Sequence, residues 1–383
     1  MKAVIAIDSF KGSLSSREAG LAVEKGIKEV FSDAECEVCE LADGGEGTVS
    51  AVISATQGTL CRVFVTGPLG EQVEAEYGVI SDTRTAVIEM SAAAGITLVD
   101  PSRRDPMHTT TFGVGELILH AIQTNGCRKF IIGIGGSATN DGGVGMLQAL
   151  GFSFLDADGC EIPRGAMGLS KLCRIDCGGA VPELSECEFH IACDVTNPLC
   201  GEQGCSAVYG PQKGATPQDV QLMDGWLSRY AKLTACVTGR DLATVPGTGA
   251  AGGMGFAFLS YLGGTLESGI SLVMRETNLE KKLSDADIVI TGEGRLDGQT
   301  CMGKAPVGVA RLAKQYGKTV IAFSGCVTDD ARLCNEHGID AFFPILRTVC
   351  TLEDAMNKKN AFRNLQDTAE QAFRLIRCVK TSK

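Results

Sequence analysis

The last third of the sequence alternates strictly between strand-like and helix-like segments. Its apolar runs are ADIVITGEG, TVIAFSG and DAFFPI, and they alternate with PVGVARLAKQYG, DDARLCNEHG and a final helix. Neighbouring parallel strands need a crossover connection, which a helix supplies, so this βαβαβα order is typical of a doubly wound parallel sheet. The alternation therefore predicts an α/β fold for this part of the chain.

The N-terminus has the same character. The apolar run KAVIAI precedes a helix that opens with a capping box, Ser15-x-x-Glu18. The strand-like CEVCELA follows, and then the helix TVSAVISAT, which we expect to be capped by Gly58. Both ends of the chain therefore carry parts of a parallel sheet.

The stretch between the two ends begins differently. From Cys61 to Met90 the segments CRVFVT, VEAEYGV and TAVIEM alternate between polar and apolar residues, as antiparallel strands do. This pattern predicts one α/β domain that is interrupted by another. We assign residues 1–60 and 285–383 to the discontinuous doubly wound domain, and residues 61–284 to an inserted mixed α/β domain.

Length and charge narrow the class of protein further. A chain of 383 residues exceeds one ordinary domain, and its net charge of −11 disfavours binding to nucleic acid or to an anionic membrane. Asp8 interrupts the first apolar run, so that run predicts a strand and not a signal peptide, and no stretch is long enough to span a bilayer. We expect a cytoplasmic protein whose 17 cysteines are reduced, and the sequence defines no oligomeric state.

Glycine is unusually frequent, at 48 of 383 residues, or about one in eight against roughly 7% on average. Much of the excess lies in loops that follow predicted strands: AIDSFKGS, LADGGEGT, IGGSATNDGG, ACDVTNPL and ITGEGRLDGQT. In open α/β sheets, ligands bind at the carboxyl ends of the strands. The five loops are therefore predicted to share one cleft.

The loop GIGGSATNDGG, residues 133–143, fits the pattern G-x-G-x-x-A that some dinucleotide sites use. The acidic residue that should follow such a site has only Asp156 and Asp158 as candidates, and both lie in a turn, which disfavours an NAD site. Backbone N–H groups before a helix can instead hold phosphate oxygens. We predict this role for Gly135, Gly136, Ser137, Asn140, Gly142 and Gly143.

Charged residues in these loops suggest how phosphate and metal are held. Asp194 and Asp297 each follow a strand that is expected to be buried, and an octahedral metal that carries phosphate oxygens needs only one or two such carboxylates. Lys11 follows the first strand directly. Lys304 lies in GQTCMGKA, a near match to the Walker A pattern that places Ala305 where Ser or Thr should stand, and it can still reach a phosphate as a point charge.

Seven blocks make these loops recognisable as a set. They are DSFKGSLSS, ADGGEGT, GIGGSATNDGGVGM, CDVTNPLCGEQG, YGPQKGA, PGTGAAGGMGF and TGEGRLDGQT. On these blocks the chain resembles the bacterial glycerate kinase family, of the type 1, glycerate 2-kinase-like group, over essentially its whole length. The resemblance implies an ATP-dependent kinase acting on D-glycerate. It also implies two α/β domains, one flavodoxin-like and interrupted by the other, with the active site between them.

Phosphoryl transfer depends mainly on positioning and charge stabilisation, and we expect the loops to serve these roles. The glycine loop, together with Gly252, Gly253 and Lys304, would hold the ATP phosphates. Asp194, Glu293 and Asp297 would hold Mg²⁺. Lys11 and Arg295 would neutralise the transferred phosphoryl group or the glycerate carboxylate. Asp43 would orient or deprotonate the substrate hydroxyl, a role that Asp194 can exchange with it.

Other functions fit the sequence less well. The motifs HExxH and GxSxG are absent, and the four histidines are scattered, which excludes the common zinc protease and hydrolase patterns. If the protein phosphorylates D-glycerate, the 2-hydroxyl of glycerate is the expected phosphoryl acceptor, and its 3-hydroxyl is the alternative. A non-catalytic nucleotide or hydroxy-acid sensor is a further alternative, but all the charged loop residues of a kinase are present.

Overall fold

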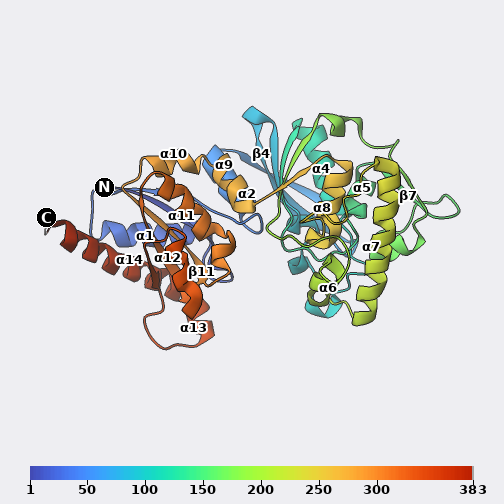
Figure 1. Cartoon of the computed structure of the whole chain (residues 1–383). Coiled ribbons are helices and arrows are strands. Elements are labelled where there is room, and N and C mark those ends of the chain that lie inside the picture. The colour runs from blue at the N-terminus through green and yellow to red at the C-terminus, as the bar shows by residue number, and fades with distance from the viewer. Residues whose placement is uncertain (382–383) are drawn as a thin grey trace. The chain divides into compact units, whose positions relative to one another are not determined.

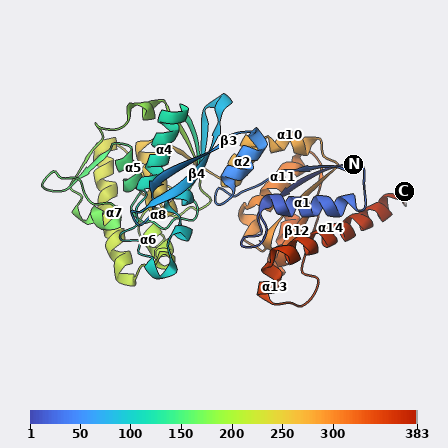
Figure 2. The same cartoon turned by 180° about the vertical axis from the view of Figure 1, so that it is seen from behind.

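The computed structural model describes residues 1–381, and within them the chain divides into two compact units (Figures 1 and 2). Unit 1 consists of residues 1–43 and 50–56 and of the chain from Ile270 onward. Unit 2 consists of residues 44–49 and 57–269. From the sequence, the inserted domain that corresponds to unit 2 was expected to span residues 61–284. None of the helices within residues 1–381 combines the length and the apolar character that crossing a bilayer requires.

Unit 1 is built on a five-stranded parallel sheet with the order β13-β12-β11-β1-β2. The strands are β1 (Lys2–Ile7), β2 (Glu35–Val38), β11 (Ile288–Leu296), β12 (Thr319–Val327) and β13 (Ala341–Pro344). Counted along the chain within this unit, the order is 2-1-3-4-5, which is the flavodoxin-like order. The predicted doubly wound parallel sheet, formed from both ends of the chain, is therefore confirmed.

Helices cover both faces of this sheet. Its helices are α1 (Ser16–Lys28), α2 (Thr48–Thr56), α9 (Gly269–Glu276), α10 (Leu279–Ser284), α11 (Ala305–Gln315), α12 (Leu333–Glu336), α13 (Leu352–Met356) and α14 (Lys358–Thr381). Helices α1 and α14 lie side by side in both views (Figures 1 and 2). Along β1, Ile5 packs in the cluster with residues of α1 and α14, whereas Val4 packs with residues of α11. Strands buried on both faces are typical of a parallel sheet.

Helix ends in the two units follow their local sequence, with one exception. Ser15 accepts a hydrogen bond from the backbone N–H of Glu18, which confirms the predicted capping box of α1. Thr216 forms a second capping box at the start of α7 (Pro217–Thr238), which has a proline at its first position. At the end of α2, however, Gln57 and not Gly58 takes the left-handed conformation, with φ of 54°.

Unit 2 contains a six-stranded mixed sheet with the order β10-β9-β6-β5-β4-β3. The strands are β3 (Thr59–Thr66), β4 (Gln72–Ile80), β5 (Thr85–Glu89), β6 (Lys129–Gly133), β9 (Glu188–Ala192) and β10 (Thr265–Glu267). The first three pair antiparallel, as their alternating pattern predicts, and the others pair parallel. A separate two-stranded sheet consists of β7 (Ser153–Leu155) and β8 (Arg174–Asp176).

The helices of unit 2 pack on an apolar core. They are α3 (Ser91–Ala94), α4 (Phe112–Asn125), α5 (Val144–Ala149), α6 (Cys205–Tyr209), α7 (Pro217–Thr238) and α8 (Ala250–Tyr261). Tyr230 of α7 is fully buried and makes edge-to-face contacts with Phe154 and Phe256. Such aromatic pairs stabilise a core beyond their buried area, by about 0.5–1.5 kcal/mol each. Within residues 1–381, no disulfide joins any of the cysteines.

Candidate active site

The carboxyl edge of the unit 1 sheet carries a pocket of about 380 Å³. Along the chain, β2 is added on one side of β1 and β11 on the other, so the direction of winding reverses between β1 and β11. Ligands in doubly wound sheets bind at this reversal. Six of the predicted site residues line the pocket, together with Asp8: they are Lys11, Asp43, Glu293, Arg295, Asp297 and Lys304.

Asp8, Lys11 and Asp43 form one group of charges at this edge. The Nζ of Lys11 lies 3.2 Å from Oδ2 of Asp43, and the backbone N–H of Ser9 donates to Oδ1 of Asp8 at 2.7 Å. Burial and the charge of Asp43 raise the pKa of Asp8 to about 7, against the opposing effects of Ser9 and Lys11. For Lys11, burial acts to lower the pKa, but the carboxylates of Asp43 and Asp8 outweigh it and the pKa is raised.

Asp8 is a site residue that the sequence analysis did not select. Its loop, AIDSFKGS, was recognised, but Asp8 reads there as the end of a strand. The structure shows it only 6% exposed and close enough to two other carboxylates, Asp43 and Glu293, for their charges to raise its pKa. A carboxylic acid whose pKa lies near neutrality is a candidate for proton transfer.

The raised pKa of Asp8 predicts how stability depends on pH. Because the folded-state pKa of about 7 exceeds the ordinary value of 3.8, the folded protein binds this proton more tightly, and stability falls as the pH rises from about 4 to about 7. Asp8→Asn keeps an acceptor for the Ser9 amide but carries no charge. We expect this variant to gain about 2 kcal/mol over the wild type at pH 8 and little at pH 4.

Urea unfolding at the two pH values, without nucleotide or divalent metal, measures the difference. The exposed Asp33 offers a matched control, since Asp33→Asn should follow the wild type at both pH values. A gain from Asp8→Asn that is equal at pH 4 and pH 8 would show that the Asp8 carboxyl is not desolvated as described.

A second group of charges comes from β11 and the loop after it. Glu293 and Arg295 are two residues apart on one strand and therefore project on the same face. The hydroxyl of Thr300 donates to Oε1 of Glu293 at 2.6 Å. The pKa of Glu293 is raised overall, because burial raises it by more than this hydrogen bond lowers it.

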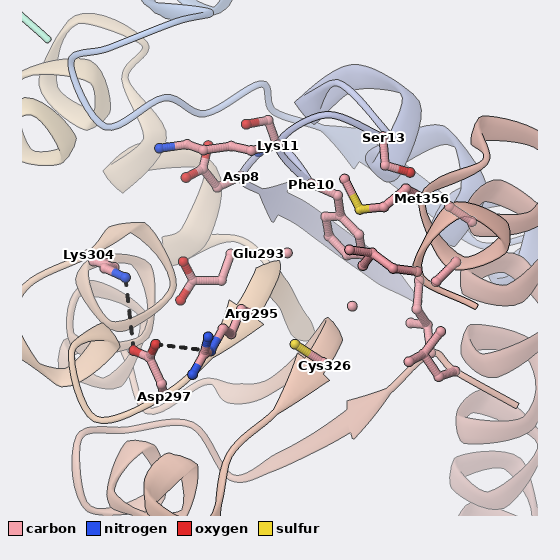
Figure 3. A pocket seen from close by; sticks show the side chains of 18 of the residues that line it. Asp8, Phe10, Lys11, Ser13, Glu293, Arg295, Asp297, Lys304, Cys326 and Met356 are labelled. Carbon is pink, nitrogen blue, oxygen red and sulfur yellow. Dashed lines mark hydrogen bonds and ion pairs between the residues drawn. The ribbon is translucent and has the colours of Figure 1, made fainter. Parts of the chain in front are cut away.

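Asp297 is held from several sides. The Nε of Arg295 lies 3.4 Å from its Oδ2, and the Nζ of Lys304 lies 3.9 Å from its Oδ1 (Figure 3). Backbone N–H groups of Gln299 and Thr300 also donate to Oδ1. Lys304 itself is the N-cap residue of α11, so it stands where a helix begins. The two cations and the carboxylate thus form one network in the pocket.

An apolar wall closes the other side of the pocket, and the sequence analysis missed it. It is formed by Phe10 and by side chains from the segment after β13: Ile345, Leu346, Leu352, Ala355 and Met356. In Figure 3, Phe10 and Met356 lie on the side opposite to Lys304 and Asp297. Apolar residues in a loop give no motif.

The predicted glycine loop and Asp194 belong to unit 2. In this loop, Gly135 and Gly136 are exposed, whereas Ser137, Asn140, Gly142 and Gly143 are buried. Asp194 accepts a hydrogen bond from the backbone N–H of Gly269 at 3.1 Å. The shared cleft of all five loops, and the roles of these residues, stay predictions.

Close packing within unit 2 accounts for several of the predicted glycines. The N–H of Gly142 donates to the carbonyl of Gly252 at 2.9 Å, and a Cβ on Gly253 would lie 2.7 Å from the Cα of Gly142. Both Gly252 and Gly253 also have positive φ, of 67° and 96°. Two backbone loops therefore approach each other more closely than side chains allow. Of the six residues predicted in the first loop, Gly135 and Gly136 are the two exposed ones.

Lys213 is buried against the glycine loop and holds it in place through hydrogen bonds. It is only 2% exposed, and its Nζ donates to Oγ of Ser137 at 2.7 Å and to the carbonyl of Thr139 at 2.6 Å. Burial lowers the pKa of Lys213 to about 8. Lys213 is therefore a buried anchor whose partners are atoms of the glycine loop.

The oxygen ligands in the unit 1 pocket suit a hard cation. Among residues 1–381 no three His, Cys, Asp or Glu side chains are grouped as a metal site. Mg²⁺, however, is usually bound through one or two carboxylates, with water and phosphate oxygens completing its shell. Asp8, Asp43, Glu293 and Asp297 supply such oxygens around one pocket.

Known proteins match this chain along its whole length. The model of the glycerate kinase family matches residues 3–377. Glycerate 2-kinase of Escherichia coli K12 is 50% identical over 376 residues, which is 98% of this chain and 97% of the E. coli chain. Glycerate kinase of Haemophilus influenzae is 48% identical over 376 residues, covering 98% of this chain and 99% of its own. A crystal structure from Salmonella typhimurium LT2, described as a glycerate kinase 2, covers 100% of this chain and 99% of its own with a TM-score of 0.90 and 50% identity.

Proposed function

This chain belongs to the glycerate kinase family and is therefore a kinase, and from this premise we propose that it transfers the γ-phosphoryl group of ATP to the 2-hydroxyl of D-glycerate. The products are 2-phospho-D-glycerate and ADP. The choice of the 2-hydroxyl is supported by the relative from Escherichia coli, which is named a glycerate 2-kinase and shares half of its residues with this chain.

The observation that carries the proposal is the gathering of three cations and four carboxylates around one pocket at the β1–β11 reversal. The transferred phosphoryl group spreads negative charge over its oxygens, and catalysis consists mainly of positioning and of stabilising that charge. Lys11 lies on the β1 side of the pocket, and Arg295 and Lys304 lie on the β11 side. We assign Lys11 and Arg295 to the transferred group and Lys304 to the ATP phosphates.

Glu293 and Asp297 would hold Mg²⁺, with Asp194 as a further candidate ligand. When bound, the ion supplies positive charge that the phosphate oxygens share. The hydrogen bond from Thr300 to Glu293, and those from the amides of Gln299 and Thr300 to Asp297, hold the two carboxylates in place before a substrate arrives. Such pre-organisation lowers the cost of binding the ion and the nucleotide together.

Asp43 and Asp8 are the candidates to receive the hydroxyl proton. Asp43 was selected from the sequence for its place after a strand, and its contact with Lys11 holds it at the pocket. Asp8 is buried, and its pKa of about 7 matches the range in which a general base works best at neutral pH. One of the two takes the proton while the other orients the hydroxyl.

A ³¹P NMR spectrum of the product formed from D-glycerate, ATP and Mg²⁺ tests this function. We expect the resonance of 2-phosphoglycerate to appear together with ADP, and neither to appear in a matched sample without glycerate. A 3-phosphoglycerate resonance would keep the kinase and correct the position of the acceptor. ATP that stays intact in the presence of D-glycerate would overturn the proposed reaction.

A further inference from the structure

The pocket has two chemically different sides, and we propose that its apolar side binds the adenine base of the nucleotide. This inference rests on the proposed function in one respect, namely that ATP is the phosphoryl donor. It goes further by placing the base in unit 1, on the wall formed by Phe10, Ile345, Leu346, Leu352, Ala355 and Met356.

Of the two substrates, only the nucleotide matches both sides of the pocket. Glycerate has three carbons, each of which carries oxygen, so an apolar wall offers it nothing and would desolvate its polar groups. Adenine presents two flat faces of low polarity, and nucleotide and cofactor sites are lined mainly by apolar and aromatic side chains with few polar groups. Phe10 and Met356 supply a ring and a thioether, which both pack well against aromatic faces.

The layout of the strands shows how far the apolar wall reaches. Phe10 directly precedes Lys11 in the loop after β1, whereas Ile345 and Leu346 directly follow β13. Neighbouring strands lie about 4.8 Å apart, so β13 is displaced from β11 by about 10 Å along the edge of the sheet. A ligand that touches the residues after β13 as well as Arg295 on β11 must be far longer than a three-carbon acid. A base between Phe10 and the residues after β13, with its phosphates at Lys11, Arg295 and Lys304, satisfies this requirement.

Figure 3 shows the order of these groups in the pocket. Lys304, Asp297 and Arg295 lie together on one side, and Cys326 of β12 lies between them and the wall with Met356. Polarity therefore changes across the pocket, from Lys304 and Asp297 on one side to Phe10 and Met356 on the other. A nucleotide has the same change of polarity, from phosphates to base.

Two exposed leucines make the inference testable without disturbing the fold. Leu346 and Leu352 line the pocket and are 41% and 79% exposed. Val349 lies between them on the same segment and is 105% exposed, but it is not among the residues that line the pocket. We therefore compare the double variant Leu346→Asn/Leu352→Asn with the control Val349→Asn. Asparagine is neutral, so neither variant adds a charge that would repel phosphate.

The measurement is isothermal titration calorimetry with two probes, ADP and inorganic tripolyphosphate, each with Mg²⁺. We expect the double variant to bind ADP at least tenfold more weakly than the wild type and tripolyphosphate within twofold of it. The control variant should bind both probes as the wild type does. An ADP affinity that is unchanged in the double variant, or that falls by the same factor as the tripolyphosphate affinity, would overturn the assignment of the base.

The outcome also separates this inference from the proposed reaction. A wild-type protein that forms no phosphoglycerate, combined with the expected loss of ADP affinity in the double variant, would refute the reaction and support the adenine site. A wild-type protein that phosphorylates glycerate, combined with an unchanged ADP affinity in the double variant, would support the reaction and refute the site.

Discussion

We expect the Lys11→Ala variant to turn over its substrates roughly 100- to 1,000-fold more slowly than the wild type, which corresponds to about 3 kcal/mol of transition-state stabilisation. The reason is the position of the Nζ. It lies 3.2 Å from Asp43 in a pocket with four carboxylates, so it is the nearest cation to the acids that are candidates for the hydroxyl proton. A cation placed in this way stabilises charge that develops during transfer.

The fold should survive this change, because the side chain of Lys11 is 71% exposed. The initial rate of phosphoglycerate formation, measured at saturating ATP and D-glycerate, gives the turnover number. Lys281→Ala is a suitable control, since Lys281 is an exposed lysine of α10 in the same unit. A loss of less than tenfold would mean that Lys11 does not meet the charge of the transition state.

The second large effect concerns stability. We expect Asp141→Ala to lower the free energy of unfolding by about 3–5 kcal/mol. Asp141 is completely buried and accepts hydrogen bonds from the amide and hydroxyl of Thr111 and from the amides of Gly143 and Gly145. The same Thr111 hydroxyl accepts from the amide of Met146. Alanine would leave these donors without partners in the interior.

A thermal unfolding curve detects the change. For a unit of this size, 1 kcal/mol corresponds to a shift of about 2–4 °C, so the midpoint should fall by roughly 10 °C. Asp158→Ala serves as the reference, because Asp158 lies in an exposed turn of the same unit and its loss should cost little. A midpoint for Asp141→Ala within 2 °C of the wild type would show that the network does not hold the loop.

Asp141 also illustrates the limits of prediction from sequence. Its loop, GIGGSATNDGG, can be recognised from the sequence. What the sequence could not reveal is that its partner Thr111 comes from another loop, 30 residues earlier. The same holds for Gly142, where a Cβ would meet Tyr230 and Leu227 of α7. A glycine that faces a side chain and a glycine that faces a ligand look alike until the tertiary contacts are known.

The edge of the unit 1 sheet was more predictable, for a physical reason. The alternation of strands and helices determines where each strand ends, and parallel strands all end at one edge. Lys11, Asp43 and Asp297 could be selected because each follows such an end. Leu346 and Leu352 could not, because an apolar residue in a loop has no distinguishing pattern until its neighbours are in place.

The divided construction of unit 1 has a consequence for the order in which the protein can assemble during synthesis. Ala3 of β1 pairs with Cys36 of β2 on one side and with Ile288 of β11 on the other, so the second edge of β1 must wait for a partner that is translated about 285 residues later. At about 5–20 residues per second, that interval is roughly 15–60 s. All six strands of the unit 2 sheet emerge from the ribosome within it. The nascent chain must therefore keep an apolar first strand from unproductive pairing while the inserted unit is completed.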